Sequence, residues 1–379
     1  MRHLPDWIQA YMAYTGQSES PDVFHKWVAI NLISGALRRK AFYDMGYFLV
    51  YPNMYIVLVA PAGRCKKSTA MRMGRSVLDK VPDIEWSVDS ITRERLIQDL
   101  SQAFKDGQSA MTSHNSEFAS LLTSSGMDMV VFLTDIFDCP TEWTHKTKSG
   151  GTNKIKSPYL NLLGATTPDW IATAMPLDTI GIGLTSRIVF VYSNNPRVRP
   201  PRPKLNNAQK QLHPMLIHDL TSIAQISGEY VMDADCETVY DNWYESRIQD
   251  PNPTGDPRLA GYFERKPIHL IKLMMVLAAS KSDDLTMTTE HFHEAHEYLK
   301  EIEEDLPNVF ANVGKNPLNK DIEDIMATVM SHEDGFTRDE LISRFKHSVR
   351  IEELNEVMDT LIAMNKILFD PTTRKYRRI

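Results

Sequence analysis

An uninterrupted apolar segment constrains the fold of this chain more than any other feature: residues Asn53 to Ala60 read NMYIVLVA. The segment is rich in β-branched residues and does not alternate with polar ones, which is the pattern of a strand buried on both faces in a parallel sheet. A turn containing Gly63 follows, and the apolar spacing then predicts a helix from Ser68 to Val81. A buried strand that runs through a turn into a helix indicates an α/β fold.

Further apolar segments predict strands of the same α/β core: Ser109–His114, Tyr159–Ala165 and Arg187–Tyr192. Hydrophobic residues make up 42% of the 379 residues and charged residues 24%, as in an ordinary globular protein. No apolar segment reaches the roughly 18 residues that span a bilayer, and the first residues do not form a signal peptide. Because the three cysteines are too scattered for disulfides or a zinc site, we expect a cytoplasmic protein without a membrane partner.

Composition and turn signals divide the chain into predicted segments: N-terminal helices (1–45), the α/β core (46–200), a helical region (201–315) and a terminal unit (316–379). The stretch from Asn194 to Pro203 (NNPRVRPPRP) has the proline content of a linker. From Gln209 to about Pro307 the sequence reads as helices. The core is therefore expected to lie between helical segments.

The terminal segment has the order of elements of a winged helix-turn-helix. Its predicted helices and strand are Lys320–Ser331, Arg338–Phe345, Ile351–Asn365 and Ile367–Phe369. The predicted wing carries basic side chains that could touch DNA phosphates: Arg374, Lys375, Arg377 and Arg378. The helix that opens at Ile351 (IEELNE) is too acidic for a comfortable major-groove reader, so duplex binding and protein docking both stay open.

The turn after the buried strand has the composition of a phosphate-binding loop. Phosphates require backbone N–H groups at a helix N-terminus, a lysine over the β and γ oxygens, and a hydroxyl for magnesium. The residues predicted to bind the nucleotide are Ala60, Gly63, Lys66, Lys67, Ser68 and Thr69. Lys67 and Ser68 supply the lysine and the hydroxyl.

Two positions of this turn depart from the strict phosphate-loop pattern. Pro61 stands at the first glycine position, and Lys66 stands at the second, where a non-glycine residue must adopt a backbone conformation that glycine takes more easily. A lysine-rich surface turn is the alternative interpretation. Lys66 and Lys67 compete as the phosphate lysine, and Lys67 is favoured because Ser68 directly follows it.

Hydrolysis requires a carboxylate at a strand end to position water. Glu117, just past the Ser109–His114 strand, is the favoured candidate, and Asp135 in VVFLTD is the competing one. The VVFLTD segment also reads as a buried helix with Asp135 and Asp138 at its end. Ser116 stands where an aspartate is usual, so magnesium would rest on Ser68 and water; Ser68 and Glu117 are the predicted residues of the magnesium site.

Two other positions suit contacts to a γ-phosphate. The strand YLNLLGATT ends in Thr166 and Thr167, whose hydroxyls could orient water, although a simple strand-ending turn is the alternative. Arg187 enters the next hydrophobic strand about twenty residues later. An arginine there is often structural, but in a ring it could act as a finger on the γ-phosphate of the neighbouring subunit.

The segment from Trp143 to Lys156 carries four lysines around Gly150-Gly151 and no acidic residue. Its alternation predicts a β-hairpin with the lysines of each arm on one face: Lys146, Lys148, Lys154 and Lys156. In a ring, such hairpins would line a channel with cations suited to a phosphate backbone. A solvated loop is the alternative; the net charge of −7 excludes only a protein covered in nucleic acid.

The order of these parts resembles the AAA+ ATPases, specifically the replication helicases of phages and mobile elements related to MCM and superfamily 3 helicases. The resemblance runs from about residue 20 to 280 in these segments: YPNMYIVLVAPAGRCKKST, SEFASLL, FLTDIFDCPTEW, LNLLGATTPDW, GLTSRIVFV and YFERKPIHLIKL. It implies an AAA+ (RecA-like) P-loop core with a helical lid. The roles it implies are Walker A for Lys67 and Ser68, Walker B for Glu117, sensor for Thr166, arginine finger for Arg187 and second sensor for Arg265.

The resemblance and the loop together predict an ATP- and Mg²⁺-dependent DNA translocase or helicase for phage or mobile-element replication. The expected partners are DNA, other replication proteins and further copies of the chain in a ring, which the resemblance implies to be a hexamer. A helicase loader or initiator that uses ATP as an assembly switch is the alternative, and a module that binds ATP without hydrolysis is a third.

Overall fold

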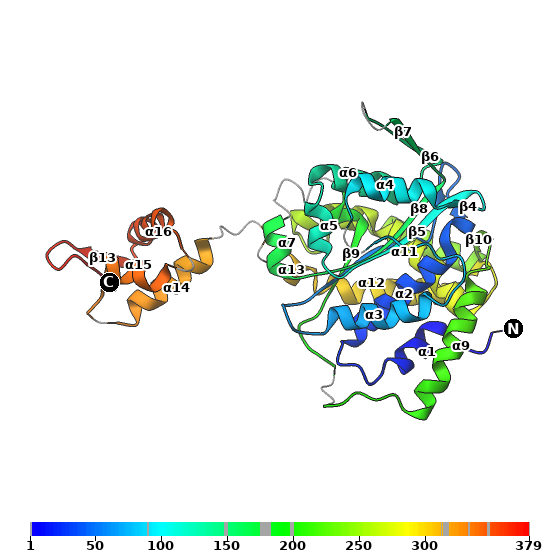
Figure 1. The fold of residues 1–379 in the computed structure, drawn as a ribbon, viewed down its shortest axis with the longest axis horizontal. Helices are drawn as coiled ribbons and strands as arrows, with labels where there is room; N and C mark the ends of the chain where they lie inside the picture. Colours follow the sequence, from blue (N-terminus) through cyan, green and yellow to red (C-terminus); the bar gives the residue numbers. More distant parts are fainter. Residues whose placement is uncertain are drawn as a thin grey trace. The chain divides into compact units, whose positions relative to one another are not determined.

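The computed structural model describes residues 2–88, 91–147, 151–174, 183–197, 201–311, 313, 318–332, 334–346 and 349–378. Contacts divide the chain into two compact units, residues 1–313 and residues 314–379, and each is described by itself (Figure 1). The first unit combines helices with parallel β-sheet, which confirms the predicted α/β core. The second is a small unit with its own hydrophobic core.

The first unit is organised around a five-stranded sheet with the order β4-β5-β8-β3-β9. Its strands are β3 (Tyr55–Val59), β4 (Phe104–Lys105), β5 (Gln108–Asn115), β8 (Pro158–Thr166) and β9 (Ile188–Tyr192). Strands β5, β8, β3 and β9 are parallel, and β4 pairs antiparallel with β5. Every residue of β3, β5 and β8 is buried. The four strands expected from apolar runs are confirmed, because central parallel strands bury both faces.

Helices cover both faces of this sheet, as the layers in Figure 1 show. On one face lie α1 (Trp7–Tyr14), α2 (Asp22–Leu37) and α3 (Lys67–Leu78). On the other lie α4 (Arg93–Gln102), α5 (Phe118–Thr123), α6 (Met127–Phe137) and α7 (Pro168–Ala174). Ile56 and Leu58 of β3 belong to the first core, and Tyr55, Val57 and Val59 belong to the second. The alternation of β3 therefore divides the interior into two cores.

A second sheet, with the order β11-β10-β1-β2, corrects the sequence-based expectation for two segments. Its strands are β1 (Ala41–Asp44), β2 (Leu49–Val50), β10 (Gly228–Met232) and β11 (Thr286–Met287). Residues 1–45 and 209–307 were both expected to be helical, but β1, β10 and β11 lie within them. Strand β10 pairs in parallel with β1, far away in the sequence, so the pairing partner is invisible to a local pattern.

Long helices complete the first unit: α9 (Asn207–Ile223), α10 (Ala234–Ser246), α11 (Ala260–Lys281), α12 (Thr289–Glu303) and α13 (Leu306–Val309). Short 3₁₀ turns are η1 (Arg38–Lys40), η2 (Thr185–Arg187) and η3 (Pro257–Leu259). Residues of α1, α2, α3, α9, α11 and α12 share one hydrophobic core. Within the described ranges, no helix combines the length and the apolar character needed to cross a lipid bilayer.

The second unit contains α14 (Leu318–Met330), β12 (Phe336–Thr337), α15 (Arg338–Phe345), α16 (Ile351–Ala363), β13 (Ile367–Asp370) and β14 (Lys375–Arg378). Its strands form an antiparallel sheet with the order β12-β14-β13. Thr337 begins α15 with a reciprocal cap: its hydroxyl accepts from the Glu340 amide, and the Glu340 carboxylate accepts from the Thr337 amide. The expected order of helices and terminal strands is present, with β12 as an additional strand.

The contact between α2 and α3 depends on Gly74. A Cβ atom at this position would lie 2.5 Å from Cγ1 of Val28 in α2. We expect Gly74→Ala to lower the free energy of unfolding by roughly 1–2 kcal/mol, because overpacking costs more than the helix propensity that alanine gains. Thermal denaturation followed by circular dichroism measures the change. Ser76→Ala on the exposed side of α3 is the matched control and should not lower stability; equal behaviour of the two variants would contradict the close packing.

Candidate functional site

The parallel strands bring several predicted site residues to one edge of the central sheet. Val59, the last residue of β3, pairs with Thr166, the last residue of β8. The amide of Ala60 donates to the carbonyl of Thr166 at 3.3 Å. Asn115 at the end of β5 pairs with Gly164 of β8, and Glu117 follows it. The turn after β3, the end of β8 and the chain after β5 therefore share the carboxyl edge, where ligands of open α/β sheets bind.

The turn between β3 and α3 has the backbone of an anion-binding loop. Gly63 has φ of +70°, Cys65 +60° and Lys66 +45°. Lys66 is the residue before α3 and has ψ of 44°, the left-handed conformation that glycine favours. The geometric expectation for a non-glycine residue at this position is confirmed. Successive left- and right-handed residues at a helix N-terminus direct backbone N–H groups toward a common point, which suits phosphate oxygens.

Neighbouring elements hold this strained turn in place. The Lys66 carbonyl accepts a hydrogen bond from the Ser20 hydroxyl at 3.1 Å. The Cys65 thiol is buried and donates to the Ser193 carbonyl at 3.5 Å. The Ser193 amide in turn donates to the Val59 carbonyl at 3.0 Å. Left-handed residues other than glycine persist only where surrounding structure fixes them, and these contacts come from both neighbouring segments.

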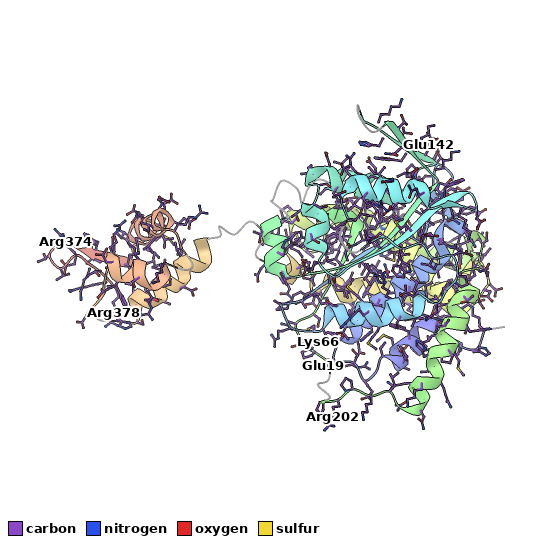
Figure 2. All side chains as sticks on the ribbon, in the orientation of Figure 1. Glu19, Lys66, Glu142, Arg202, Arg374 and Arg378 are labelled. Atoms are coloured by element: carbon purple, nitrogen blue, oxygen red, sulfur yellow. The ribbon has the colours of Figure 1, made fainter. Side chains whose placement is uncertain are left out.

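The two lysines of the turn point in different directions. The Lys67 ammonium donates to the carbonyl of Ala60 at 2.7 Å, so this side chain folds back over the turn. Burial lowers the pKa of Lys67 from its ordinary value. The Lys66 side chain is exposed, with its ammonium 3.9 Å from the Glu19 carboxylate (Figure 2). The geometry favours Lys67 over Lys66 as the lysine that meets an anion in the turn.

A cavity of about 420 Å³ adjoins the turn. Lys66 and Thr69 line it from the turn and α3, together with Met73. The remaining walls come from two segments that are distant in the sequence: residues 14–19 and 203–205. Its side chains include Tyr14, Met73 and Leu205, so an apolar, flat group attached to a phosphate chain would fit beside the turn.

Two buried polar atoms near the same edge lack a partner among the described residues. The Thr166 hydroxyl and the Asn115 amide oxygen accept and donate no hydrogen bond there. The Thr167 hydroxyl, in contrast, has a partner: it accepts a hydrogen bond from the Trp170 amide at 3.3 Å, at the start of α7. Buried polar atoms are normally hydrogen-bonded. Two such atoms without a partner beside this turn therefore indicate a polar ligand or bound water.

Of the two candidate carboxylates, only Glu117 lies at this edge. It follows β5 directly, precedes α5 and is exposed. Asp135 lies within helix α6, where its carboxylate accepts from the indole N–H of Trp143 at 3.2 Å. The interpretation of VVFLTD as a buried helix is confirmed, because the segment belongs to α6, whose apolar side packs into the core.

Arg187 and Arg265 lie at the opposite, amino edge of the sheet. Ile188 pairs with Tyr55, the first residue of β3, and Arg187 immediately precedes it. The five residues of β3 therefore separate Arg187 from the turn by about 16 Å along the strand. The structure thus brings the two arginines together, but away from the turn that follows the same β3.

One carboxylate holds both arginines. Asp138 accepts from Arg187 at 2.6 Å through one oxygen and from Arg265 at 3.0 Å through the other. Arg187 also donates to the Gly183 carbonyl at 2.9 Å. Burial alone would raise the pKa of Asp138, but the hydrogen bonds and charges of the two arginines hold this pKa below its ordinary value. Each arginine is therefore ordered before any external anion arrives.

Lys272 adds a third cation beside this group. Its ammonium is buried and donates to the Tyr51 carbonyl at 2.7 Å and to the Asn53 side-chain oxygen at 2.5 Å. It also lies 4.5 Å from the centre of the Phe137 ring. Burial lowers the pKa of Lys272 to about 8. A cavity of about 300 Å³ is lined by Lys272, Arg265 and Asp138 among others.

Sequence reasoning did not assign functions to Asn115, Asp138 or Lys272. The sequence signal for Asn115 was a polar residue at the end of a predicted buried strand. Lys272 was available as a lone charge in the apolar run HLIKLMMVL of α11. Asp138 had no such signal, because its role depends on two arginines that come from distant segments.

The predicted hairpin is present as β6 (Glu142–Thr147) and β7 (Gly151–Lys156), projecting beyond α4 and α6 (Figure 1). The register opposes Lys146 to Thr152, and Glu142 to Lys156, so Lys146, Lys154 and Lys156 share one face. Lys148 falls outside the described residues. The lysines are partly neutralised, because Glu142, just before the predicted segment, lies 3.1 Å from the Lys154 ammonium.

The other face of the hairpin fixes its base to the first unit. Ile155 is buried, and the Trp143 ring packs edge-on against Phe132 at 4.9 Å between centroids. The Ser101 hydroxyl of α4 donates to the Lys154 carbonyl at 2.9 Å. The hairpin is therefore a fixed arm with one cationic face and one anchored face.

In the second unit, the four basic residues come from the turn before β14 and from β14 itself: Arg374, Lys375, Arg377 and Arg378 (Figure 2). Arg374 has φ of +53° in the turn. Arg377 lies 3.7 Å from Asp370. Tyr376 precedes Arg377 in β14 and lies on the opposite side of the strand. Its ring packs against Phe369 with 4.9 Å between the ring centroids. The arrangement gives the β13–β14 hairpin a basic character.

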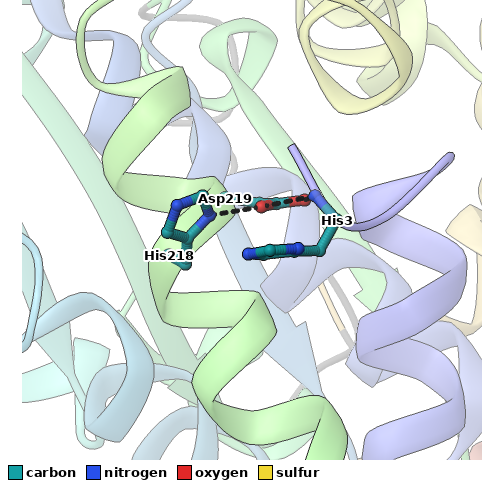
Figure 3. A group of neighbouring side chains, drawn as sticks. All are labelled: His3, His218 and Asp219. Atoms are coloured by element: carbon teal, nitrogen blue, oxygen red, sulfur yellow. Dashed lines mark hydrogen bonds and ion pairs between the residues drawn. The ribbon is translucent and has the colours of Figure 1, made fainter. Parts of the chain in front are cut away.

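A further cluster joins His3, His218 and Asp219 near the N-terminus (Figure 3). The buried Asp219 carboxylate accepts from the amides of His3 and Leu4 at 2.8–2.9 Å and from His218 Nδ1 at 2.8 Å. Both of its oxygens are thus engaged in hydrogen bonds. The cluster fixes the N-terminal segment on α9.

No protein-family model matches this chain, and no curated protein matches its sequence. What the two edges of the sheet can do is therefore inferred from their own residues.

The left-handed backbone at Lys66 generates a test of the turn. We expect Lys66→Gly to retain or raise stability by up to about 1 kcal/mol, because glycine takes this conformation without steric cost. Lys66→Val should lower stability by roughly 1–2 kcal/mol, since a β-branched residue tolerates positive φ poorly. Thermal denaturation measures both. Arg64→Val, in the same turn without positive φ, is the control. Indistinguishable Gly and Val variants would contradict this turn conformation.

Proposed function

We propose that this chain is an ATPase of the AAA+ (RecA-like) P-loop type that works as a ring-forming DNA translocase or helicase. One observation carries the proposal: the left-handed turn before α3 folds the Lys67 ammonium back toward the carboxyl end of β3. An anion seated on the N–H groups of this turn would meet that ammonium directly. The unpaired polar atoms of Thr166 and Asn115 at the same edge support a phosphate and an ordered water there.

The residues at this edge fit the parts of nucleotide hydrolysis. Lys67 would leave the Ala60 carbonyl for the β and γ oxygens, and the exposed Ser68 hydroxyl would hold Mg²⁺, which neutralises phosphate charge. Glu117 would lie near the ion and accept a proton from the attacking water, while Thr166 and Asn115 would orient that water. The adjoining cavity would receive the base and sugar, with Tyr14 and Leu205 providing apolar contact.

The separation of the two edges supports assembly in a ring. Arg187 and Arg265 lie at the amino edge, a strand length from the turn of their own subunit. In a head-to-tail arrangement, the amino edge of one copy faces the carboxyl edge of the next, and such an interface closes into a ring. Both arginines would then contact the triphosphate of the neighbouring copy, in a hexamer by resemblance.

DNA is the proposed partner inside the ring. The cationic face of the β6–β7 hairpin, with Lys146, Lys148, Lys154 and Lys156, would follow a phosphate backbone without reading sequence. The second unit, as a winged helix-turn-helix, would add contacts through Arg374, Lys375, Arg377 and Arg378 or dock replication proteins. The resemblance assigns this activity to phage or mobile-element replication in the cytoplasm.

One observation favours a second candidate function, a helicase loader or replication initiator. The ion pair between Glu142 and Lys154 reduces the positive charge that the hairpin offers to DNA. A loader requires ATP-dependent assembly, but it does not have to stay bound to a DNA strand while moving along it. Strand displacement by the purified protein separates the two, because a loader alone does not unwind DNA.

The phosphate turn and the amino edge make different contributions, which two variants separate. We expect Lys67→Ala to abolish ATP binding and hydrolysis. Arg187→Ala should retain ATP binding and lose turnover by a factor on the order of 10³ or more, as for arginine fingers. Equilibrium ATP binding and phosphate release measure these effects. Lys80→Ala, at an exposed lysine just after α3, is the control and should change both values little.

Normal hydrolysis by Arg187→Ala rings would refute the trans-acting finger. Normal ATP affinity in Lys67→Ala would refute the phosphate turn itself.

The hairpin makes a separate prediction about DNA. Replacing Lys146, Lys154 and Lys156 together with alanine should weaken DNA binding about 10-fold or more at moderate salt and flatten its salt dependence, because fewer counterions are released. Fluorescence anisotropy across a salt series measures both quantities.

A control variant carries three exposed lysines of other elements changed to alanine: Lys80, Lys210 and Lys300. It should bind DNA as the unmodified chain does. Equal losses in the two variants would show a general charge effect and remove the hairpin from the DNA site.

A further inference from the structure

The turn between β1 and β2 exposes large hydrophobic side chains at the surface. Tyr47 is 101% exposed and Phe48 53% exposed. The turn is nevertheless well fixed: the Met45 amide donates to the Phe48 carbonyl at 3.0 Å, and the Gly46 amide donates to the Asp44 carboxylate at 2.7 Å. Single exposed apolar residues are common, but adjacent aromatic residues on an ordered turn indicate a contact surface.

This turn adjoins the cationic cavity at the amino edge. Phe48 and Leu49 line the cavity of about 300 Å³ together with Asp138, Arg265 and Lys272. Arg187 shares the Asp138 carboxylate. Three cations thus gather around one carboxylate, and the other partners of Lys272 are neutral oxygens. Charges removed from water need opposite charges nearby, so this group has room for a further anion.

We propose that the aromatic turn (residues 45–49) and this cavity form one docking surface for a second copy of this chain. The inference rests on the proposed function, because the anion it assigns is the triphosphate on the neighbour's phosphate turn. Arg187 and Arg265 supply the contacts to that anion. Tyr47 and Phe48 cover the rim and exclude water, which strengthens the charge interactions inside.

A second copy fits better than a nucleic-acid strand. Arg265 and Lys272 line a cavity of about 300 Å³, which suits a compact phosphate group presented by a neighbour, whereas a DNA backbone needs cations spread along an open surface. The carboxyl edge of a second copy would present the matching anion, a triphosphate bound at the turn before α3. Different patches of one chain thus complement each other, as a ring requires.

Lys272 acts as a positioning residue in this surface. It is too deeply buried to touch the neighbour's phosphate, but its charge lies close enough to influence Asp138 and Arg265. When the triphosphate competes with Asp138 for the arginines, this third cation favours the more highly charged anion.

The test uses the full chain with Tyr47→Ser and Phe48→Ser combined. Because these side chains are exposed, thermal stability should stay within a few degrees of the unmodified chain. Sedimentation velocity with ATP and Mg²⁺ should show assembly of the unmodified chain and an at least 10-fold weaker assembly of the variant. ATP affinity, measured at concentrations where both are monomeric, should be unchanged, while turnover per subunit falls.

A matched control changes exposed hydrophobic residues on and after α10, Tyr244→Ser with Ile248→Ser, and should assemble normally. Normal assembly of the Tyr47/Phe48 variant, or lost DNA affinity with intact assembly, would overturn the inference while leaving the ATPase proposal standing. Absence of assembly by the unmodified chain would overturn the inference and the ring, and absence of ATP binding would overturn the proposed function as well.

Discussion

The parallel pairing of β3 between β8 and β9 is the constraint on which the rest of the molecule depends. Every side chain of β3 is buried, with one set of alternate residues in each hydrophobic core. Burial on both faces fixes the register, because a shift by one residue would exchange the two cores. The register then determines which residues leave the sheet together: the phosphate turn, Thr166 and the chain after Asn115 emerge at one edge, and Arg187 enters at the other. The proposed function rests on this separation of edges.

Under the proposed function, the same separation would leave neither edge complete within one subunit. The carboxyl edge carries hydrogen-bond donors and the Lys67 ammonium, but no arginine of the predicted pair. The amino edge carries Arg187 and Arg265, yet the only carboxylate that they share among the described residues is that of Asp138. A carboxylate is a weaker counterpart than a triphosphate for two guanidinium groups. In the proposed ring, Asp138 would hold the arginines ordered in a free subunit and would yield them to a neighbour's phosphate.

The central strands could be predicted from the sequence because their apolar runs carry the whole signal locally, and the predicted helix Arg338–Phe345 has the bounds of α15. Strand β10 was missed because its side chains alternate between buried and exposed and its partner β1 lies nearly two hundred residues earlier. The grouping of Arg187 with Arg265 could not be predicted, since it depends on how α11 packs beside η2. The serine that follows Lys67 favoured Lys67 over Lys66 as the phosphate lysine. That the two side chains point in different directions could be seen only in the structure.

The departures of the phosphate turn from the usual glycine pattern have a physical resolution. Lys66 adopts the left-handed conformation that a glycine would take, at a cost of about 1–2 kcal/mol. The Ser20 hydroxyl bonds the Lys66 carbonyl, and the buried Cys65 thiol bonds the Ser193 carbonyl, so contacts from the N-terminal segment and from the end of β9 offset that cost. A sequence that departs from the usual motif thus still specifies a left-handed turn before α3. If this turn binds phosphate as proposed, its N–H groups would gain a charged partner, and that contact would offset the strain at the functional step rather than in the free chain.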